Sequence, residues 1–208
     1  MLISFIFSCF ALAISPGPDN IYLTTLTSRS GKIAGFSFLL GLITGCFIHT
    51  ILLAYGLNEL LIRHYIFFEI IKYTGIFYIL YLSYEAYKSE ISNFYLDKNK
   101  DEIQKNFKKG VLMNLLNPKV FLFFTLFFPN FIYSETISFK FQILSLGLIF
   151  IIITFIVFGL IILFSNFIHN IFYSNNGFKI FAKYLNILVL LLIALLILFT
   201  ENNLFLTN

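Results

Sequence analysis

The amino-acid sequence predicts an all-α, polytopic membrane protein with six transmembrane helices arranged as two inverted three-helix repeats. Its 208 residues are 59% hydrophobic and only 12% charged, whereas soluble domains average about 25% charged residues. Six apolar runs are long enough to cross a bilayer, since a span needs roughly 20 mostly apolar residues. A proline break also recurs at corresponding places in the two halves, at Pro16-Gly17-Pro18 and at Asn117-Pro118.

The six apolar runs lie close together along the chain. They are Leu2–Leu26, Ile33–Leu57, Tyr65–Tyr87, Gly110–Ile132, Phe139–Phe164 and Lys179–Thr200. The first begins like the apolar core of a signal peptide, but no lysine or arginine precedes it, and cleavage at Ala11-Leu12-Ala13 would delete half of the span. We therefore expect it to be a retained helix.

The later runs differ in the number of charged residues that interrupt them. The third carries Glu69 and Lys72, three residues apart on one helix face, which is the spacing of a local ion pair. The fifth contains no charge between Phe141 and Phe164, and the sixth is rich in aliphatic residues. Six spans use about 120–150 residues and leave no room for a soluble domain. We expect one membrane domain, with repeat one at 1–87, a hydrophilic loop at 88–109 and repeat two at 110–208.

The two halves also share a motif in their second spans. The second run carries Phe38-Leu39-Leu40-Gly41-Leu42-Ile43, and the fifth carries Leu144-Ser145-Leu146-Gly147-Leu148-Ile149. Because each half has an odd number of spans, the second half would be inverted in the membrane. Inverted repeats with broken helices in corresponding positions are typical of transporters.

Lysine and arginine gather on one side of the predicted domain. They follow the first, third and fifth runs at Arg29, Lys32, Lys88, Lys98, Lys100, Lys105, Lys108, Lys109, Lys179 and Lys183. The other side has little beyond Arg63 and Lys140. By the positive-inside rule, the loop 88–109 is expected to be cytoplasmic and both termini outside. The net charge of +4 therefore reflects orientation and does not indicate nucleic-acid binding.

The two proline breaks point to a solute site. Proline lacks an amide donor and clashes with the preceding turn, and backbone groups freed in lipid must be buried in protein or line a cavity. At 1.5 Å per residue, Pro16 lies roughly 22 Å from the outer surface and Pro118 roughly 12 Å from the cytoplasmic surface. In a hydrocarbon core of about 30 Å, both breaks fall near one level. We expect one shared site, the alternative being two unrelated kinks.

Asp19 and Asn20 follow the first break. A carboxylate inside a span usually faces the bundle interior or a water-filled cavity, and Asp19 stands near the start of a helix, where the helix dipole favours negative charge. It is a candidate to bind an ammonium group or a proton that exchanges with one. The alternative is a helix-capping carboxylate near the cytoplasmic interface. Asn20 is a candidate hydrogen-bonding neighbour.

Lys119 follows the second break, with Asn114 and Asn117 one helical turn or less away. Three roles for Lys119 are open: binding a substrate carboxylate, pairing with Asp19 in the empty state, or extending its ammonium group towards the cytoplasmic interface. The two asparagines offer polar groups to a site. Asn117 alternatively caps only the backbone groups freed by Pro118.

The second run carries glycines and a histidine. Gly31 and Gly35, and then Gly41 and Gly45, form two G-x-x-x-G spacings that allow close approach of another helix. We interpret them as packing positions, either within the chain or in a homodimer. Histidine side chains in general titrate near neutral pH, so His49 is a candidate for proton coupling, the alternative being a hydrogen bond to a neighbouring helix.

Together these segments resemble the LysE/RhtB family of amino-acid exporters. The matching stretches are Ser15-Pro16-Gly17-Pro18-Asp19-Asn20, Gly41-x-x-x-Gly45-x-x-x-His49, Lys72-x-x-Gly75-x-x-Tyr78-x-x-Tyr81-Leu82 and Gly110-x-x-x-Asn114-Leu115-Leu116-Asn117-Pro118-Lys119. Their order and spacing cover essentially the whole chain. One departure is Cys46, because many relatives carry an acid after the second glycine of the second run.

The resemblance implies a bacterial inner-membrane exporter of amino acids or close derivatives, driven by proton antiport, and not an enzyme. The transport core would lie at the two breaks, with Asp19 and His49 as proton-coupling candidates. Asp19 and Lys119 together suit a zwitterion, and the lack of further acids favours neutral substrates. The expected partners are an amino acid, the lipid bilayer and a second copy of the chain. We expect neither cofactor nor metal, because Cys9 and Cys46 lack ligand spacing.

Two alternatives differ in chemistry. The same fold could export a cation or another small solute, but Asp19 is the only strong buried anion near the breaks, and divalent-cation sites gather several ligands. A membrane thiol-redox carrier would need a reactive cysteine in each half. The half from Lys108 to Asn208 contains none.

Overall fold

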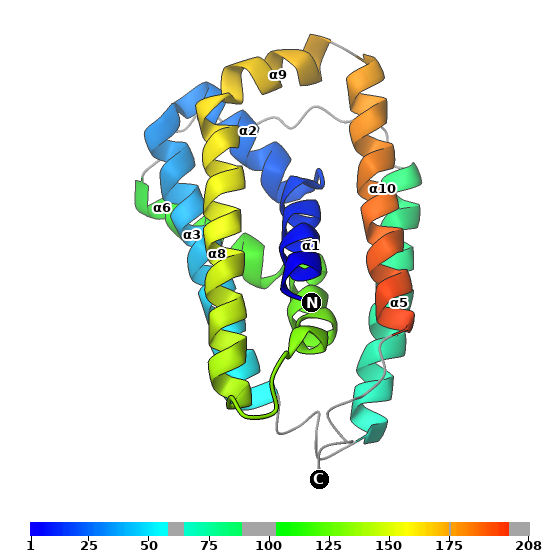
Figure 1. Ribbon diagram of the computed structural model, residues 1–208. Coiled ribbons are helices and arrows are strands. Elements are labelled where there is room, and N and C mark those ends of the chain that lie inside the picture. Colours follow the sequence, from blue (N-terminus) through cyan, green and yellow to red (C-terminus); the bar gives the residue numbers. More distant parts are fainter. Residues whose placement is uncertain (58–64, 89–102, 175, 200–208) are drawn as a thin grey trace.

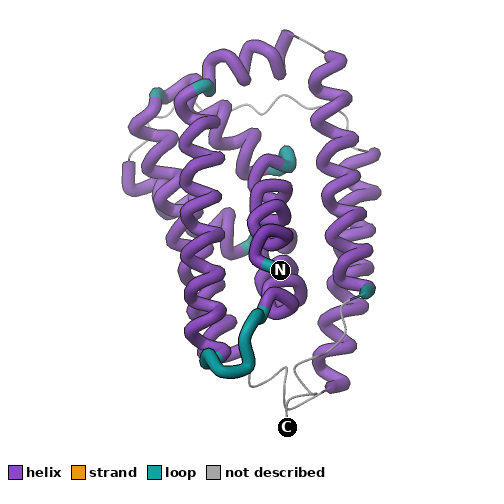
Figure 2. The backbone as a smooth tube through the Cα atoms, viewed as in Figure 1, coloured by secondary structure: helices purple, strands orange, loops and turns teal. Residues whose placement is uncertain are grey.

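The computed structural model describes residues 1–57, 65–88, 103–174 and 176–199. Every regular element in these ranges is a helix, as Figures 1 and 2 show. The all-α prediction is therefore confirmed. The centre of the predicted loop, residues 89–102, lies outside the described residues.

The helices follow the six predicted runs in order. In the first half they are α1 (Leu2–Ile14), α2 (Pro18–Ser30), α3 (Lys32–Leu52), its π-helical continuation η1 (Leu53–Leu57) and α5 (Tyr65–Lys88). In the second half they are α6 (Ile103–Leu115), α7 (Pro118–Leu122), η2 (Phe123–Phe127), η3 (Phe128–Phe131), α8 (Phe139–Leu163), α9 (Ser165–Ser174) and α10 (Asn176–Leu198).

Both predicted helix breaks are present. The chain bends by 56° between α1 and α2, and by 50° between α6 and the helical segment that begins at Pro118. In each case a proline occupies the start of the resuming helix. The first amide groups of a helix have no intrahelical acceptor, so the missing donor of proline is tolerated there. Each bent pair has the length and composition of one membrane span.

Three helical segments are long and apolar enough to cross a membrane alone. They are Lys32–Tyr55, Phe139–Leu163 and Ile180–Leu198. With the two bent pairs, length and composition give up to five candidate spans among the described residues. The 24 residues of α5 extend about 36 Å, which also matches a hydrocarbon core of about 30 Å. The described residues of all six predicted runs are thus mainly helical, as expected for a polytopic membrane protein.

Two helical segments were not expected from the sequence. α6 begins at Ile103, inside the segment 88–109 that we predicted to be a loop. Asn106, Gly110 and Asn114 are spaced four residues apart and form one buried face of α6. This face packs on α3 and holds the polar first turns of α6 in the bundle. The short helix α9 joins α8 to α10 and lies across one end of the bundle, as Figure 1 shows. We call this the α9 end.

The predicted glycine packing is confirmed between α3 and α6. A Cβ atom built at Gly41 would overlap the carbonyl oxygen of Phe107 and would lie 2.9 Å from Gly110 Cα. One turn further, a Cβ at Gly45 would lie 2.7 Å from Asn114 Cβ. A Cβ at Gly35 would overlap Thr27 of α2. Gly35, Gly41 and Gly45 are therefore occupied by contacts within the chain, whereas no atom outside its chain neighbours lies within 4 Å of a Cβ built at Gly31, where packing was also predicted.

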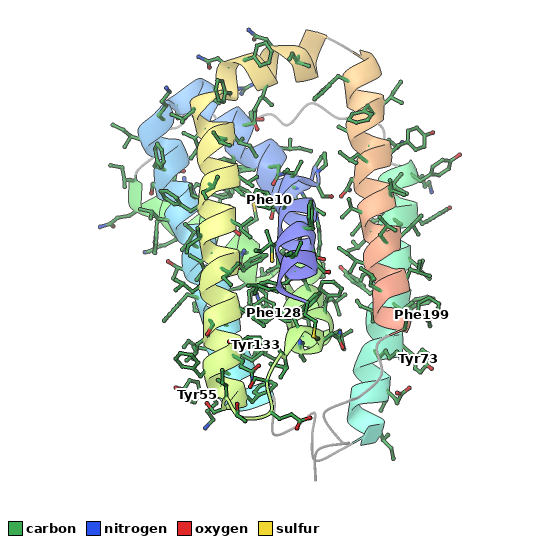
Figure 3. All side chains as sticks on the ribbon, in the orientation of Figure 1. Phe10, Tyr55, Tyr73, Phe128, Tyr133 and Phe199 are labelled. Atoms are coloured by element: carbon green, nitrogen blue, oxygen red, sulfur yellow. The ribbon has the colours of Figure 1, made fainter. Side chains whose placement is uncertain are left out.

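An aromatic core fixes the second break against the first half of the bundle. The ring of Phe5 on α1 lies 5.0 Å from that of Phe128, and the ring of Phe123 lies 5.5 Å from that of Phe150 on α8. Figure 3 shows Phe128 beside α1 in the interior. Aromatic pairs at such distances add to the burial of their large apolar surfaces. The segment following Pro118 is therefore held against both α1 and α8.

Candidate functional site

The two helix breaks meet in the bundle interior. Asn117, which precedes Pro118, donates from Nδ2 to both carboxylate oxygens of Asp19, at 3.2 Å and 3.0 Å. The two residues are 98 positions apart in the sequence. Their direct contact places both breaks at one level, as the depth argument predicted.

Asp19 lies in the first turn of α2, and the N-cap position is occupied by Gly17. A Cβ at Gly17 would lie 3.2 Å from Asp19 Oδ1, so glycine leaves space for the carboxylate. The positive end of the helix dipole and the amide of Asn117 both favour a negative charge here. The N-cap residue itself, Gly17, has no side chain with which to cap the helix.

Lys119 bonds to the end of α1. Its Nζ donates to the carbonyl oxygens of Leu12 at 3.2 Å and Ser15 at 3.4 Å. The last carbonyl groups of a helix lack intrahelical donors, and the ammonium group satisfies two of them. Lys119 therefore points into the first break and not towards the cytoplasmic interface.

Asn20 and Asn117 stabilise the breaks themselves. Asn20 Nδ2 lies within hydrogen-bonding distance of three carbonyl oxygens at the end of α1, at 3.0 Å from Ala13, 3.4 Å from Ile14 and 3.3 Å from Ser15. Asn117 Oδ1 accepts from the backbone amide of Lys119 at 3.1 Å and so caps α7. Asn117 therefore has both roles that the sequence left open, as helix cap and as partner of Asp19.

An inner cavity of about 30 Å³ lies between the breaks and α3, α6 and α8. Asp19 and Lys119 line it together with Cys46, Asn114 and Thr154. Asn114 Nδ2 donates to Cys46 Sγ at 3.4 Å. A cavity of this size holds a water molecule or a small polar group but not a whole amino acid.

A larger vestibule of about 640 Å³ adjoins the breaks. Its wall is formed by both breaks, by α5 and by α10, which lie side by side in Figure 1. Its lining residues are Gly17, Pro18, Leu82, Glu85, Ala86, Lys88, Asn117, Pro118, Lys119, Asn186 and Leu190. Lys119 lines both the vestibule and the inner cavity. The volume of the vestibule is sufficient for a ligand of amino-acid size.

Two predicted site residues lie apart from this cluster. Pro16 is in the first break but lines neither cavity. His49 is buried on α3, with its ring 5.4 Å from that of Phe124 and nearly parallel to it. Its Nε2 has no hydrogen-bond partner in the described structure, and His49 also lines neither cavity.

Sequence reasoning missed three residues that reach the site. Asn186 Oδ1 on α10 accepts from Ser15 Oγ at 3.2 Å, and Glu85 on α5 lines the vestibule. Thr154 on α8 lines the inner cavity. Asn186 could have been noticed, because it is the only polar residue between Leu185 and Phe199. A single amide in an otherwise apolar span usually faces the bundle interior.

The chain matches known proteins over most of its length. The model of the LysE type translocator family matches residues 10–200. An uncharacterized membrane protein, YrhP of Bacillus subtilis (strain 168), is 31% identical over 142 residues, which cover 63% of this chain and 67% of YrhP.

Two further relatives carry a functional name. The homoserine/homoserine lactone efflux protein of Salmonella typhi is 30% identical over 128 residues, or 60% of this chain and 61% of that protein. Its counterpart in Salmonella typhimurium is 29% identical over the same shares. The chain thus spans less than two thirds of these two efflux proteins. No solved structure matches the chain.

Proposed function

The chain belongs to the LysE type translocator family, and from this premise we propose that it exports small neutral amino acids or their close derivatives from a bacterial cell. Membership makes it a multi-pass membrane transporter and not an enzyme. The efflux relatives support export as the direction of transport and supply homoserine as the first substrate to test.

The observation that carries the proposal is the convergence of Asp19, Asn117 and Lys119 where the two breaks meet. This cluster offers one carboxylate and one ammonium group beside a vestibule of sufficient size. A zwitterion presents the complementary charges, with its ammonium group for Asp19 and its carboxylate for Lys119. In the structure Lys119 is held by the α1 carbonyls, so a substrate carboxylate would compete with these weaker neutral acceptors.

Proton antiport follows from the same carboxylate. An Asp19 that binds either a proton or a substrate ammonium group would exchange the two on opposite sides of the membrane. His49 remains a second candidate for proton coupling, although it lies outside both cavities. It would act through its hydrogen bond with the backbone of Asn114 and not by touching the substrate.

The proposal is tested by efflux from vesicles containing the purified chain. Vesicles preloaded with labelled homoserine, threonine, alanine, lysine or glutamate are diluted into buffer of equal or lower pH. We expect efflux of the small neutral amino acids, faster when the outside is acidic, because inward proton movement then drives export. Efflux that is unaffected by the gradient would rule out proton antiport. No efflux of any amino acid by inserted protein would contradict the proposal as a whole.

We also propose that the protein resides in the inner membrane with the α9 end in the cytoplasm and both termini outside. Arg29, Lys32 and Lys88 stand at or next to the ends of α2, α3 and α5 that are directed towards the α9 end in Figure 1. Such clustering of lysine and arginine marks the cytoplasmic side.

A cysteine introduced at position 99, which lies outside the described residues, tests this orientation. We expect Asn99→Cys to be inaccessible to an impermeant thiol reagent in intact cells and to react after the membrane is permeabilised. The native Cys9 and Cys46 are buried and provide a low background. Glu135→Cys, in an exposed turn before α8, is the matched control and should react in intact cells. The opposite labelling of the two positions would invert the proposed topology.

A further inference from the structure

The vestibule is large enough for an amino acid, but Asp19 does not line it. Its volume of about 640 Å³ lies within the range of ~300–1,000 Å³ found for small-molecule sites. Asp19 lines only the inner cavity. Asn117 lines the vestibule and donates to both carboxylate oxygens of Asp19, so it separates this carboxylate from the vestibule. An amino acid in the vestibule must therefore be held by other groups.

Glu85 on α5 is the only acid among the described residues that line the vestibule. The hydroxyl group of Tyr81, one helical turn earlier, donates to Glu85 Oε1 at 3.1 Å. This bond leaves Oε2 as an acceptor, and Glu85 forms no ion pair within the described part of the chain. The side chain is exposed, so a solute can reach it. A carboxylate with an uncommitted oxygen is a suitable partner for an ammonium group.

Asn186 on α10 offers a hydrogen-bond donor to the same space. Its Oδ1 accepts from Ser15 Oγ at 3.2 Å, which sets the orientation of the amide group. Its Nδ2 makes no hydrogen bond within the described ranges, and it is not among the unpaired atoms that are fully buried. Because Asn186 lines the vestibule, this nitrogen can donate to a carboxylate there. Lys119, which lines both cavities, adds a positive charge.

We propose that the vestibule is a second amino-acid site, a loading site that holds the substrate before it reaches Asp19. Glu85 binds the ammonium group, and Asn186 Nδ2 binds the carboxylate with the help of the positive charge of Lys119. The site therefore takes compounds that carry a free ammonium group and a free carboxylate. This inference rests on the proposed function, because it gives the site a place on the route of export.

The vestibule lies on the side from which an exported solute arrives. Glu85 and Lys88 in its wall belong to the last turn of α5, and this end of α5 is directed towards the α9 end in Figure 1, which the proposed topology places in the cytoplasm. An amino acid can occupy the vestibule while Asn117 still bonds to Asp19. We therefore expect binding in the vestibule to be independent of the Asp19 carboxylate.

Protection of an introduced cysteine measures binding in the vestibule without transport. Ala86→Cys places a thiol group in the vestibule wall, and the native Cys9 and Cys46 are buried. The full chain in detergent is labelled with a thiol reagent at increasing concentrations of homoserine or of homoserine lactone, which keeps the ammonium group but has no free carboxylate. We expect homoserine to slow the labelling, and the lactone to need an about tenfold higher concentration, where tenfold corresponds to ~1.4 kcal/mol.

Variants in the Ala86→Cys background assign the two ends of the ligand. Glu85→Gln should raise the protecting concentration of both compounds about fivefold, the upper end for an ion pair that water can reach. Asn186→Asp keeps the acceptor for Ser15 but replaces the free donor with a negatively charged oxygen. It should therefore weaken protection by homoserine about tenfold and leave protection by the lactone intact.

Three further variants separate binding from folding and from the site at the breaks. Glu85→Ala is the second uncharged variant if glutamine impairs folding, whereas Glu85→Asp retains a carboxylate and should retain protection. Asp19→Asn, which is expected to stop export, should not weaken protection, because Asp19 does not line the vestibule. Glu135→Gln is the control, since Glu135 is an exposed acid that lines neither cavity.

The outcomes distinguish this inference from the function on which it rests. If homoserine is exported by the native protein but gives no protection, or if Asp19→Asn removes the protection, the amino acid binds only at the breaks and the inference is wrong while export stands. Unchanged protection in Glu85→Gln would also contradict it. If homoserine protects as expected but the inserted protein exports no amino acid, the vestibule binds amino acids without loading them for export, and the proposed function is wrong. The absence of both protection and export would contradict both proposals.

Discussion

Asp19→Asn is expected to reduce efflux of the preferred amino acid at least about 100-fold without preventing insertion of the protein. The substitution preserves the size of the side chain but removes the only carboxylate in the inner cavity. A substrate ammonium group would then lose its charged partner, and the positive charge of Lys119 would lose its nearest counter-charge in the cavity. A 100-fold loss corresponds to ~2.7 kcal/mol, within the range for a hydrogen bond to a charged group in a protein interior.

The measurement is initial efflux of labelled homoserine from vesicles, normalised to the amount of folded protein. Glu135→Gln is the matched control, since Glu135 is an exposed acid in the turn before α8, and its efflux should equal that of the native chain. The same variants should be compared with and without an acidic exterior. Asp19→Asn is expected to abolish any acceleration by the proton gradient. Undiminished efflux would reduce Asp19 to a structural partner of Asn117.

The positions of the breaks could be predicted from the sequence because backbone chemistry fixes them. Proline cannot continue a helix and is tolerated at its start, so Pro18 and Pro118 each begin a new helix. The depth of each break follows from the rise per residue and the thickness of the bilayer. These quantities predicted that the two breaks lie at one level, and in the structure Asp19 and Asn117 are hydrogen-bonded although 98 residues separate them.

The partners of individual side chains could not be predicted in the same way. Three roles for Lys119 were open because its long side chain can reach several environments, and only the structure places its ammonium group on the carbonyl oxygens of Leu12 and Ser15. His49 has a similar sequence context to Asn114, one turn beyond a glycine contact, yet it stacks on Phe124 outside the cavity. Rotation of each helix about its axis decides such outcomes, and apolar spans carry little periodic signal that would specify it.

Residues from the last two spans were missed for a related reason. Both spans are so apolar that neither face stands out in the sequence, and Thr154 in particular resembles an ordinary threonine that bonds to its own helix. Its place in the lining of the inner cavity depends on how α8 packs, which is a property of the folded structure. Helix α9 was missed because its ten residues are too few for a membrane span, and its polar and apolar residues alternate with helical period only over this short length.

Gly41→Ala is expected to destabilise the folded protein by about 1–3 kcal/mol, the usual cost of forcing an additional carbon atom into a packed interior. The neighbours of the added Cβ would be backbone atoms: the carbonyl oxygen of Phe107, the amide nitrogen of Val111 at 2.8 Å and Gly110 Cα at 2.9 Å. Backbone atoms cannot move aside as a flexible side chain can, so α3 and α6 would have to separate.

The separation would also disturb the site, because α6 leads directly into the second break. Asn114 and Asn117 stand one and two turns beyond Gly110, and a shift of α6 moves the partner of Asp19 with it. We therefore expect Gly41→Ala to lower both the midpoint of thermal unfolding in detergent and the rate of homoserine efflux. Repulsion between two backbones thus affects transport through the position of Asn117, without any change in the polar groups themselves.

Gly159→Ala in α8 is the matched control for Gly41→Ala, because the two variants are expected to change the unfolding midpoint in different directions. No atom outside its own helix lies within 4 Å of a Cβ built at Gly159, and alanine is favoured over glycine in a helix by up to about 1 kcal/mol. Gly159→Ala should therefore leave the unfolding midpoint unchanged or raise it, while Gly41→Ala lowers it. Equal midpoints for the two variants would mean that α3 and α6 can adjust their separation freely. The close contact would then not be what holds the second break against the first.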